Sequence, residues 1–235
     1  MNLHRITATF LPLLLVASPV WAHFVWVAIE SEGVAKPAAF VWFSELAEAD
    51  DEALIDKIAA TKVWSRANGA KSQQVAVTKQ VKDGGGALVG AIAEGTSNLS
   101  AHVEYGVLER GGQKFLLQYW AKYIDLAASD WKAVARDEAL QLDVVPHALE
   151  TGLTLEVLYA GKPAAGSEVV ILDPTAAETK LKADASGKLQ LASLKPGLYS
   201  IRAKWAVIEK GTLGDKDYPQ VNHYSTLALR VPGAK

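Results

Sequence analysis

The alternation of apolar and polar residues predicts a chain built mainly from short β-strands. The clearest example starts at Leu153, which shares one strand face with Leu155 and Val157, while Thr154 and Glu156 share the other. Turns that contain glycine, proline or aspartate separate such runs at short intervals. This pattern predicts a mainly β protein with two antiparallel β-sandwich domains, the second of them Ig-like.

The first half of the chain has the same strand patterns with one interruption. Apolar and aromatic runs at 23–30 and 38–43 predict strands. Between residues 50 and 60 the apolar side chains recur at helical spacing, and three acidic residues (50–52) stand where a helix N-terminus favours negative charge. We therefore expect one short helix near 50–60, inserted into the first sandwich. The irregular stretch 124–140 predicts a loop with a helical turn.

The N-terminus has the features of a secretory signal peptide at residues 1–22. A short basic start leads into an apolar run, and small or aliphatic residues stand at positions 20 and 22, where they set a cleavage site. The rest divides near a proline-containing hinge into an N-terminal domain (23–147) and a C-terminal domain (148–235). We expect the mature protein to be periplasmic or secreted and to begin at His23.

Composition excludes several functions and forms of chemistry. The 235 residues carry a formal charge of −2 without a basic stripe, which argues against a nucleic-acid partner. There is no cysteine, so disulfides, thiolate metal ligands and cysteine nucleophiles are excluded. No apolar stretch of the mature chain is long enough to predict a membrane span.

Several sequence blocks, in order, resemble those of a known family. They are AHFVWV (22–27), the block FSELAEADDEALIDKIAATKVWSR (43–66), YGVLERGGQKFLLQYWAK (105–122), LDVVP (142–146) and NHYSTLAL (222–229). Together they are similar to an exported family labelled NikM-like and associated with nickel and cobalt uptake. The resemblance implies a periplasmic accessory to transition-metal handling, with an inner-membrane metal transporter as its partner.

The second half has a further, broader resemblance. GKPAAGSEVVI (161–171), DASGK (184–188) and LKPGLY (194–199) are similar to transthyretin-like or carboxypeptidase-regulatory-like sandwich modules. Such modules occur in enzymes, adhesins and receptors, so this likeness implies a fold and no particular activity.

His23 is the strongest candidate for metal chemistry. As the first residue of the mature chain it would carry a free α-amine and an imidazole, and both nitrogens can chelate one ion. The α-amine has a pKa low enough for a metal to displace its proton near neutral pH. Nitrogen donors without thiolates suit copper, nickel or cobalt. The alternative is that cleavage leaves a histidine first without consequence.

Further metal ligands must be brought to His23 by the fold. His223 is the predicted second ligand, because it lies in the block 222–229, although it shares a strand face with leucines and can equally be a buried, hydrogen-bonded core histidine. His102 is a candidate for which a solvated surface position is the alternative. Glu45 can complete a metal shell or orient a ligating imidazole. His147, at the hinge, is expected on a surface loop.

These residues leave three functions open. The first is a non-catalytic periplasmic metal-binding protein that uses His23. The second is an oxidative copper enzyme, in which a terminal histidine and a second imidazole form a histidine brace. The third is an interaction or adhesion module in which the histidines have no special role. No hydrolase or nucleotide-binding motif is present.

Overall fold

The structure, a computed structural model, describes residues 23–30, 36–67, 70–83, 85–149 and 152–233. The predicted signal peptide lies outside them. Within these residues the protein is mainly β, with several antiparallel sheets, which confirms the predicted fold class. No helix among them is long and apolar enough to cross a membrane.

The helical segments lie where the sequence predicted them. The 3-10 helix η1 spans Glu52–Ile58 and is capped by Asp51, whose carboxylate accepts a hydrogen bond from the backbone N–H of Ala53 at 2.9 Å. Buried Ile55 and Ile58 on its inner face explain the helical spacing of apolar residues. The short helix α1 (Trp131–Val134) is the turn expected within the irregular stretch.

The strands form three large sheets and a small hairpin. The first sheet has the order β1 (Phe24–Glu30), β2 (Ala38–Ser44), β7 (Gly85–Ala91) and β3 (Asp50–Asp51), with β6 (Thr78–Lys82) also paired to β7. The central sheet has the order β14 (Glu178–Lys182), β13 (Glu168–Leu172), β16 (Gly197–Val207), β19 (Val221–Val231), β9 (Gln113–Asp125), β8 (Thr96–Arg110), β4 (Lys62–Ala67) and β5 (Gln73–Val75). The third sheet has the order β10 (Leu142–Ala148), β11 (Leu153–Tyr159) and β12 (Lys162–Pro163), with β15 (Lys188–Leu191) paired to β11; β17 (Gly211–Leu213) and β18 (Lys216–Tyr218) form the hairpin.

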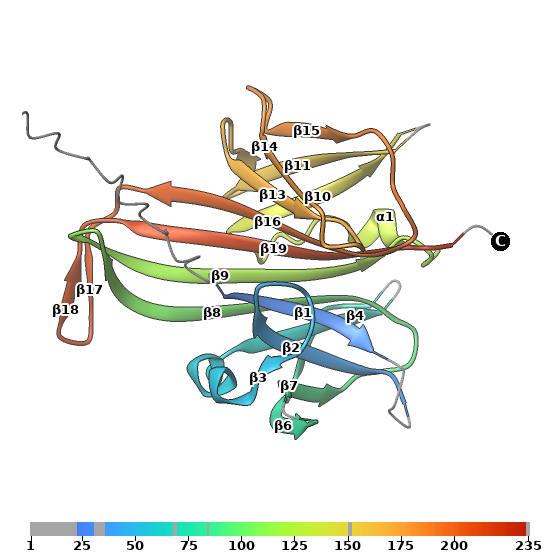
Figure 1. Ribbon diagram of the computed structural model, residues 1–235, viewed down its shortest axis with the longest axis horizontal. Coiled ribbons are helices and arrows are strands. Elements are labelled where there is room, and N and C mark those ends of the chain that lie inside the picture. The colour runs from blue at the N-terminus through green and yellow to red at the C-terminus, as the bar shows by residue number, and fades with distance from the viewer. Residues whose placement is uncertain (1–22, 31–35, 68–69, 84, 150–151, 234–235) are drawn as a thin grey trace, which may run out of the picture.

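The central sheet lies between the other two and has a buried core on each face (Figure 1). Along β9, Tyr119, Ala121 and Tyr123 belong to the core under the first sheet, whereas Trp120 and Ile124 belong to the core under the third. Both faces of β9 are covered, which explains why apolar residues occupy neighbouring positions, as at 115–117 and 119–121, instead of alternating with polar ones.

The predicted division at 147–148 does not separate two independent sheets. Strand β9, from the N-terminal segment, pairs in parallel with β19 from the C-terminal segment, from Leu116 opposite Val221 to Asp125 opposite Arg230. The core under the first sheet likewise includes Ala228. The two segments therefore share the central sheet, and neither completes its core alone.

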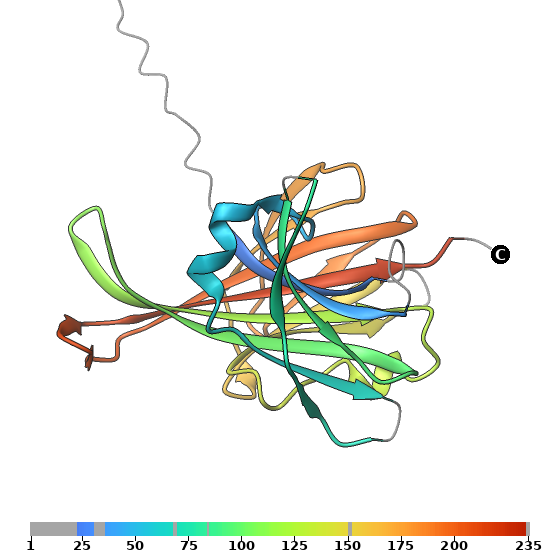
Figure 2. The same ribbon diagram turned by 90° about the horizontal axis from the view of Figure 1, so that it is seen from below.

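Two hairpins extend beyond the layered body on the same side. They are the turn that joins β8 to β9 and the β17–β18 hairpin, which leaves the sheet between β16 and β19 (Figure 2). Within β8 the register shifts at Tyr105, next to Gly106, whose φ of 123° is accessible mainly to glycine. This β-bulge changes the direction of the strand and of the Tyr105 side chain.

A buried ion pair joins the central sheet to the third sheet. The Lys122 ammonium, on β9, donates hydrogen bonds to the Asp143 carboxylate on β10 and to the carbonyl of Ala135. The side chains of Lys122 and Asp143 are only 1% and 3% exposed. The other Asp143 oxygen accepts a hydrogen bond from the backbone N–H of Asp137 at 2.9 Å. Both charges are thus paired and hydrogen-bonded, as buried charges must be.

We predict that Asp143→Ala lowers the free energy of unfolding by about 3–5 kcal/mol, because it leaves the Lys122 ammonium buried without a counter-charge. Urea unfolding measures this loss. The matched control is Asp56→Ala, which breaks the exposed pair with Lys79 and should cost less than about 1 kcal/mol. Equal losses in the two variants would contradict the role given to the buried pair.

Candidate functional site

His23 is fixed at the edge of the core under the first sheet. Its carbonyl oxygen accepts a hydrogen bond from the Tyr119 hydroxyl at 3.0 Å. The next residue, Phe24, opens β1 and pairs with Ser44 of β2. The imidazole packs against the Phe43 ring, with 5.6 Å between ring centroids. Backbone and ring are thus both held, although the side chain remains 22% exposed.

Asp50 is the acidic partner of His23. The distance between His23 Nε2 and Asp50 Oδ2 is 3.4 Å, and Asp50 Oδ1 accepts a hydrogen bond from the Asp51 backbone N–H at 2.8 Å. Asp50 belongs to β3, where it pairs with Gly86. A Cβ at Gly86 would lie 2.6 Å from Ile55 Cγ1, so glycine is what lets η1 and β3 approach β7 this closely.

This arrangement suits chelation by a terminal histidine. If processing makes His23 the first residue, as the sequence predicts, its α-amine and Nδ1 would both lie on the backbone side of the ring and could bind one ion together. That binding leaves the Nε2 proton directed at the Asp50 carboxylate. A carboxylate on the second ring nitrogen fixes the tautomer of a metal-bound histidine and makes it a stronger ligand. The acidic residues 50–52 thus have different roles, because Asp51 caps η1 and Asp50 faces His23.

His223 lies on the other face of the central sheet, inside the second core. It is 1% exposed, and its Nδ1 accepts a hydrogen bond from Trp120 Nε1 at 3.1 Å. Because the indole nitrogen can only donate, Nδ1 must be unprotonated and the ring proton must be on Nε2. The Nε2 atom is buried and has no hydrogen-bond partner in the described structure. In this tautomer neither nitrogen has a lone pair free for a metal.

His102 belongs to the same side of the sheet as His223. Its ring stacks on the Trp120 indole, with 3.9 Å between centroids and 19° between planes, and its Nε2 is 3.3 Å from the Gln118 side-chain oxygen. The indole also contacts His223, with 6.4 Å between centroids. The structure therefore brings His102 and His223 to one tryptophan and does not bring either of them to His23.

Neither Glu45 nor His147 forms an ion pair with His23 among the described residues, although Glu45 directly follows Ser44, the β2 partner of Phe24. Burial lowers the pKa of the Arg202 guanidinium, and the charges of Glu178 and Glu45 oppose that shift. His147 is exposed, as expected, and its Nε2 lies 2.9 Å from a Glu156 carboxylate oxygen. Among the described residues no group of three or more histidine, aspartate and glutamate side chains is arranged to hold a metal.

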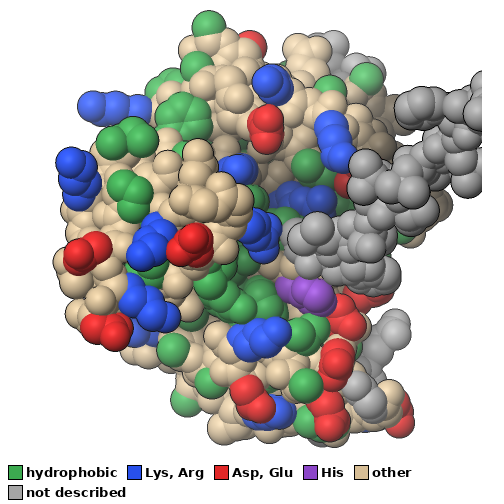
Figure 3. All heavy atoms as spheres, turned by 60° about the vertical axis from the view of Figure 1, so that its left-hand side comes forward, with side chains coloured by type: hydrophobic (Ala, Val, Ile, Leu, Met, Phe, Trp, Pro, Cys, Tyr) green, Lys and Arg blue, Asp and Glu red, His purple; other side chains and the backbone are tan. Residues whose placement is uncertain are grey.

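A hollow of about 130 Å³ adjoins His23, and the sequence analysis did not predict it. We call it the aromatic hollow; its lining is His23, Phe24, Phe43, Lys57, Tyr105, Leu108, Arg110, Phe115, Leu117, Tyr119 and Tyr224. On this face of the molecule hydrophobic side chains line a depression, with Lys and Arg side chains around it and a histidine at its edge (Figure 3). The tyrosine–glycine pair inside a strand pattern was the signal for the bulge that turns Tyr105 inward.

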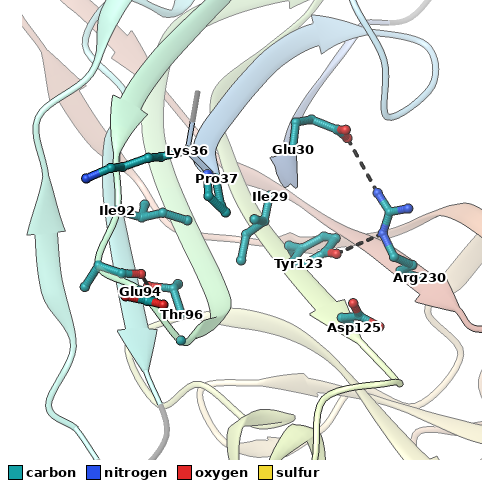
Figure 4. Close-up of a pocket in the computed structure, with 12 residues that line it drawn as sticks. Ile29, Glu30, Lys36, Pro37, Ile92, Glu94, Thr96, Tyr123, Asp125 and Arg230 are labelled. Atoms are coloured by element: carbon teal, nitrogen blue, oxygen red, sulfur yellow. Dashed lines mark hydrogen bonds and ion pairs between the residues drawn. The ribbon is translucent and has the colours of Figure 1, made fainter. Parts of the chain in front are cut away.

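A larger cavity of about 720 Å³ lies at another edge of the first core (Figure 4). Its lining contains both acidic and basic side chains, so their charges partly cancel. Arg230 lies between Glu30, at 3.7 Å, and the Tyr123 hydroxyl, to which its Nε donates a hydrogen bond at 3.0 Å. Lys36, Glu94 and Asp125 complete the charged lining. None of the predicted metal ligands lines this cavity.

Comparisons with known proteins add no family. No protein-family model and no curated protein matches the chain. Among solved structures, a pullulanase complexed with maltotriose from Anoxybacillus sp. LM18-11 matches at 9% identity, over 77% of this chain and 24% of that chain, with a TM-score of 0.20. The chain thus spans about a quarter of that enzyme, and a TM-score this low supports no argument about fold or activity.

We predict that the buried His223 makes the fold sensitive to acid. Burial, reinforced by the charge of His102, lowers the pKa of His223 from 6.5 to about 4. Between these pH values the unfolded chain binds a proton that the folded protein does not. The free energy of unfolding therefore falls as the pH drops from about 6.5 to about 4, by up to about 3 kcal/mol, and is unaffected by this group above pH 7.

Urea unfolding at pH 7.5 and pH 4.5 tests this prediction in the wild type and in His223→Gln, whose amide oxygen can still accept the Trp120 hydrogen bond. The variant should lose clearly less stability at the lower pH. His147→Gln, at an exposed histidine, is the control and should behave as the wild type does. A wild-type pH dependence that survives in His223→Gln would refute the assignment.

Proposed function

We propose that the protein is a periplasmic accessory of metal uptake or homeostasis that binds one Cu²⁺, Ni²⁺ or Co²⁺ ion through the α-amine and Nδ1 of His23. The observation that carries this proposal is the pairing of His23 Nε2 with Asp50 at 3.4 Å, because it leaves the two chelating nitrogens available and orients the ring. The hydrogen bond from Tyr119 holds the histidine backbone in place. An inner-membrane transporter is the proposed recipient of the ion.

The geometry favours binding over oxidative catalysis. A copper histidine brace requires a second imidazole on the ion bound by the terminal histidine. His102 and His223 instead contact Trp120 on the far face of the central sheet, and His147 pairs with Glu156 at the surface. The acidic group beside His23 is the Asp50 carboxylate, which lies next to Nε2. It can strengthen the binding of an ion at Nδ1, but it does not replace the second imidazole of a brace.

We expect the processed protein, with His23 first, to bind about one equivalent of Cu²⁺ or Ni²⁺. A form that keeps Ala22 ahead of His23 has an amide nitrogen in place of the amine. Its affinity for the ion should fall by more than about 100-fold. Loss of a direct ligand should cost more than the roughly 10–100-fold that follows loss of a group that only contacts a ligand. Calorimetric titration of both forms, with N-terminal mass determination of each sample, provides the measurement. Superimposable titrations would exclude the terminal amine as a ligand.

Asp50→Asn should weaken metal binding to the processed protein by about 10–100-fold, because the amide no longer stabilises the Nε2–H of a metal-bound His23. The matched control is Asp51→Asn, which removes the same charge one residue away and keeps a side chain able to cap η1. The control should retain wild-type affinity. An equal loss of metal affinity in both variants would show that the negative charge of this region matters, and not the contact between Asp50 and His23.

A further inference from the structure

We infer that the ion at His23 is held together with a small planar organic anion, and that this co-ligand occupies the aromatic hollow. The inference deepens the proposed function and rests on it. The protein then carries a metal chelate and not a bare ion. An example of such a chelate is a complex with a one-ring heteroaromatic carboxylate.

The described residues supply fewer ligands than the ion needs. His23 offers its amine and Nδ1, and the described residues hold no cluster that adds further ligands. Cu²⁺ and Ni²⁺ in nitrogen and oxygen sites adopt square-planar or tetragonal geometries, which need at least about four donors. Asp50 faces the outer ring nitrogen, on the side away from Nδ1. The remaining positions on the ion are open to a ligand from solution, and a chelating molecule would fill two of them at once.

The aromatic hollow beside His23 combines aromatic rings with basic side chains. Its lining contains the cations Lys57 and Arg110 and no carboxylate, so it favours a negative ligand. Around Tyr119 the rings stand at steep and shallow angles to one another: 89° to Tyr105, 73° to Phe43 and 33° to Tyr224. Such rings offer both faces and edges to a flat molecule.

The aromatic hollow is small. The hollow measures about 130 Å³, well below the roughly 300–1,000 Å³ of pockets that accept drug-sized ligands. A volume of this size matches a single ring with a carboxylate. Lys57 and Arg110 line the hollow and are exposed, so their cations are available to pair with that carboxylate while the ring contacts the aromatic side chains. A ring nitrogen next to the carboxylate would complete a chelate to the ion.

The test uses picolinate (pyridine-2-carboxylate) and Ni²⁺ with the processed protein. Native mass spectrometry should show a 1:1:1 complex of protein, Ni²⁺ and picolinate, and calorimetry should show that the 1:1 nickel–picolinate complex binds at least as tightly as Ni²⁺ alone. Lys57→Gln/Arg110→Gln should weaken the ternary complex at least about tenfold, the effect of one lost charge-assisted hydrogen bond, and leave the affinity for Ni²⁺ alone unchanged. The matched control is Lys182→Gln/Lys188→Gln, exposed lysines of the C-terminal segment, which should change neither affinity.

The failures of the two proposals are distinguishable. If Ni²⁺ binds but picolinate removes it without a ternary complex, the inference is overturned and the proposed function stands. If the ternary complex is equally stable in both double variants, the aromatic hollow is not its site and the inference is again overturned. If the processed protein binds neither Ni²⁺ nor Cu²⁺, the proposed function falls and the inference falls with it.

Discussion

Burial of the central sheet on both faces is the constraint from which the rest of the structure follows. Because successive side chains of a strand point to opposite faces, neighbouring residues of β9 enter different cores. Tyr119 supports His23 on one side, while Trp120 contacts His102 and His223 on the other. The sheet thus separates His23 from His102 and His223, the two histidines that the sequence offered as its partners.

The same constraint gives the polar groups of the two sides different chemistry. On the second-core side the imidazole of His223 is neutral because burial disfavours its charged form, and Trp120 selects its tautomer. The buried charges of Lys122 and Asp143 on that side are paired and hydrogen-bonded, and they join the central sheet to the third sheet. On the other side His23 and Asp50 remain partly exposed, with an open hollow beside them.

The fold class and the local elements could be predicted because they depend on short-range patterns. The alternation around Leu153 and Leu155, the helical spacing that placed η1, and the leucines on the face shared with His223 are all visible in consecutive residues. The pairing of β9 with β19 could not be predicted in this way. It joins segments about a hundred residues apart, and the only local trace is that β9 is apolar on both faces.

The candidate site was predictable only in part, for the same reason. His23 was identified from the cleavage pattern and the chemistry of a terminal histidine. Its partner Asp50 was interpreted as a helix-capping charge, because nothing local shows that β3 turns this residue toward the start of β1. The aromatic hollow likewise depends on a bulge at Tyr105 and on rings contributed by distant strands.

The most direct test of this account is a crystal structure of the processed protein loaded with Cu²⁺, with diffraction collected at the copper absorption edge. The account predicts one anomalous peak bonded to the amine and Nδ1 of His23, with Asp50 on Nε2, on the first-sheet side of the central sheet. A peak beside His102 or His223, on the opposite face, would contradict it.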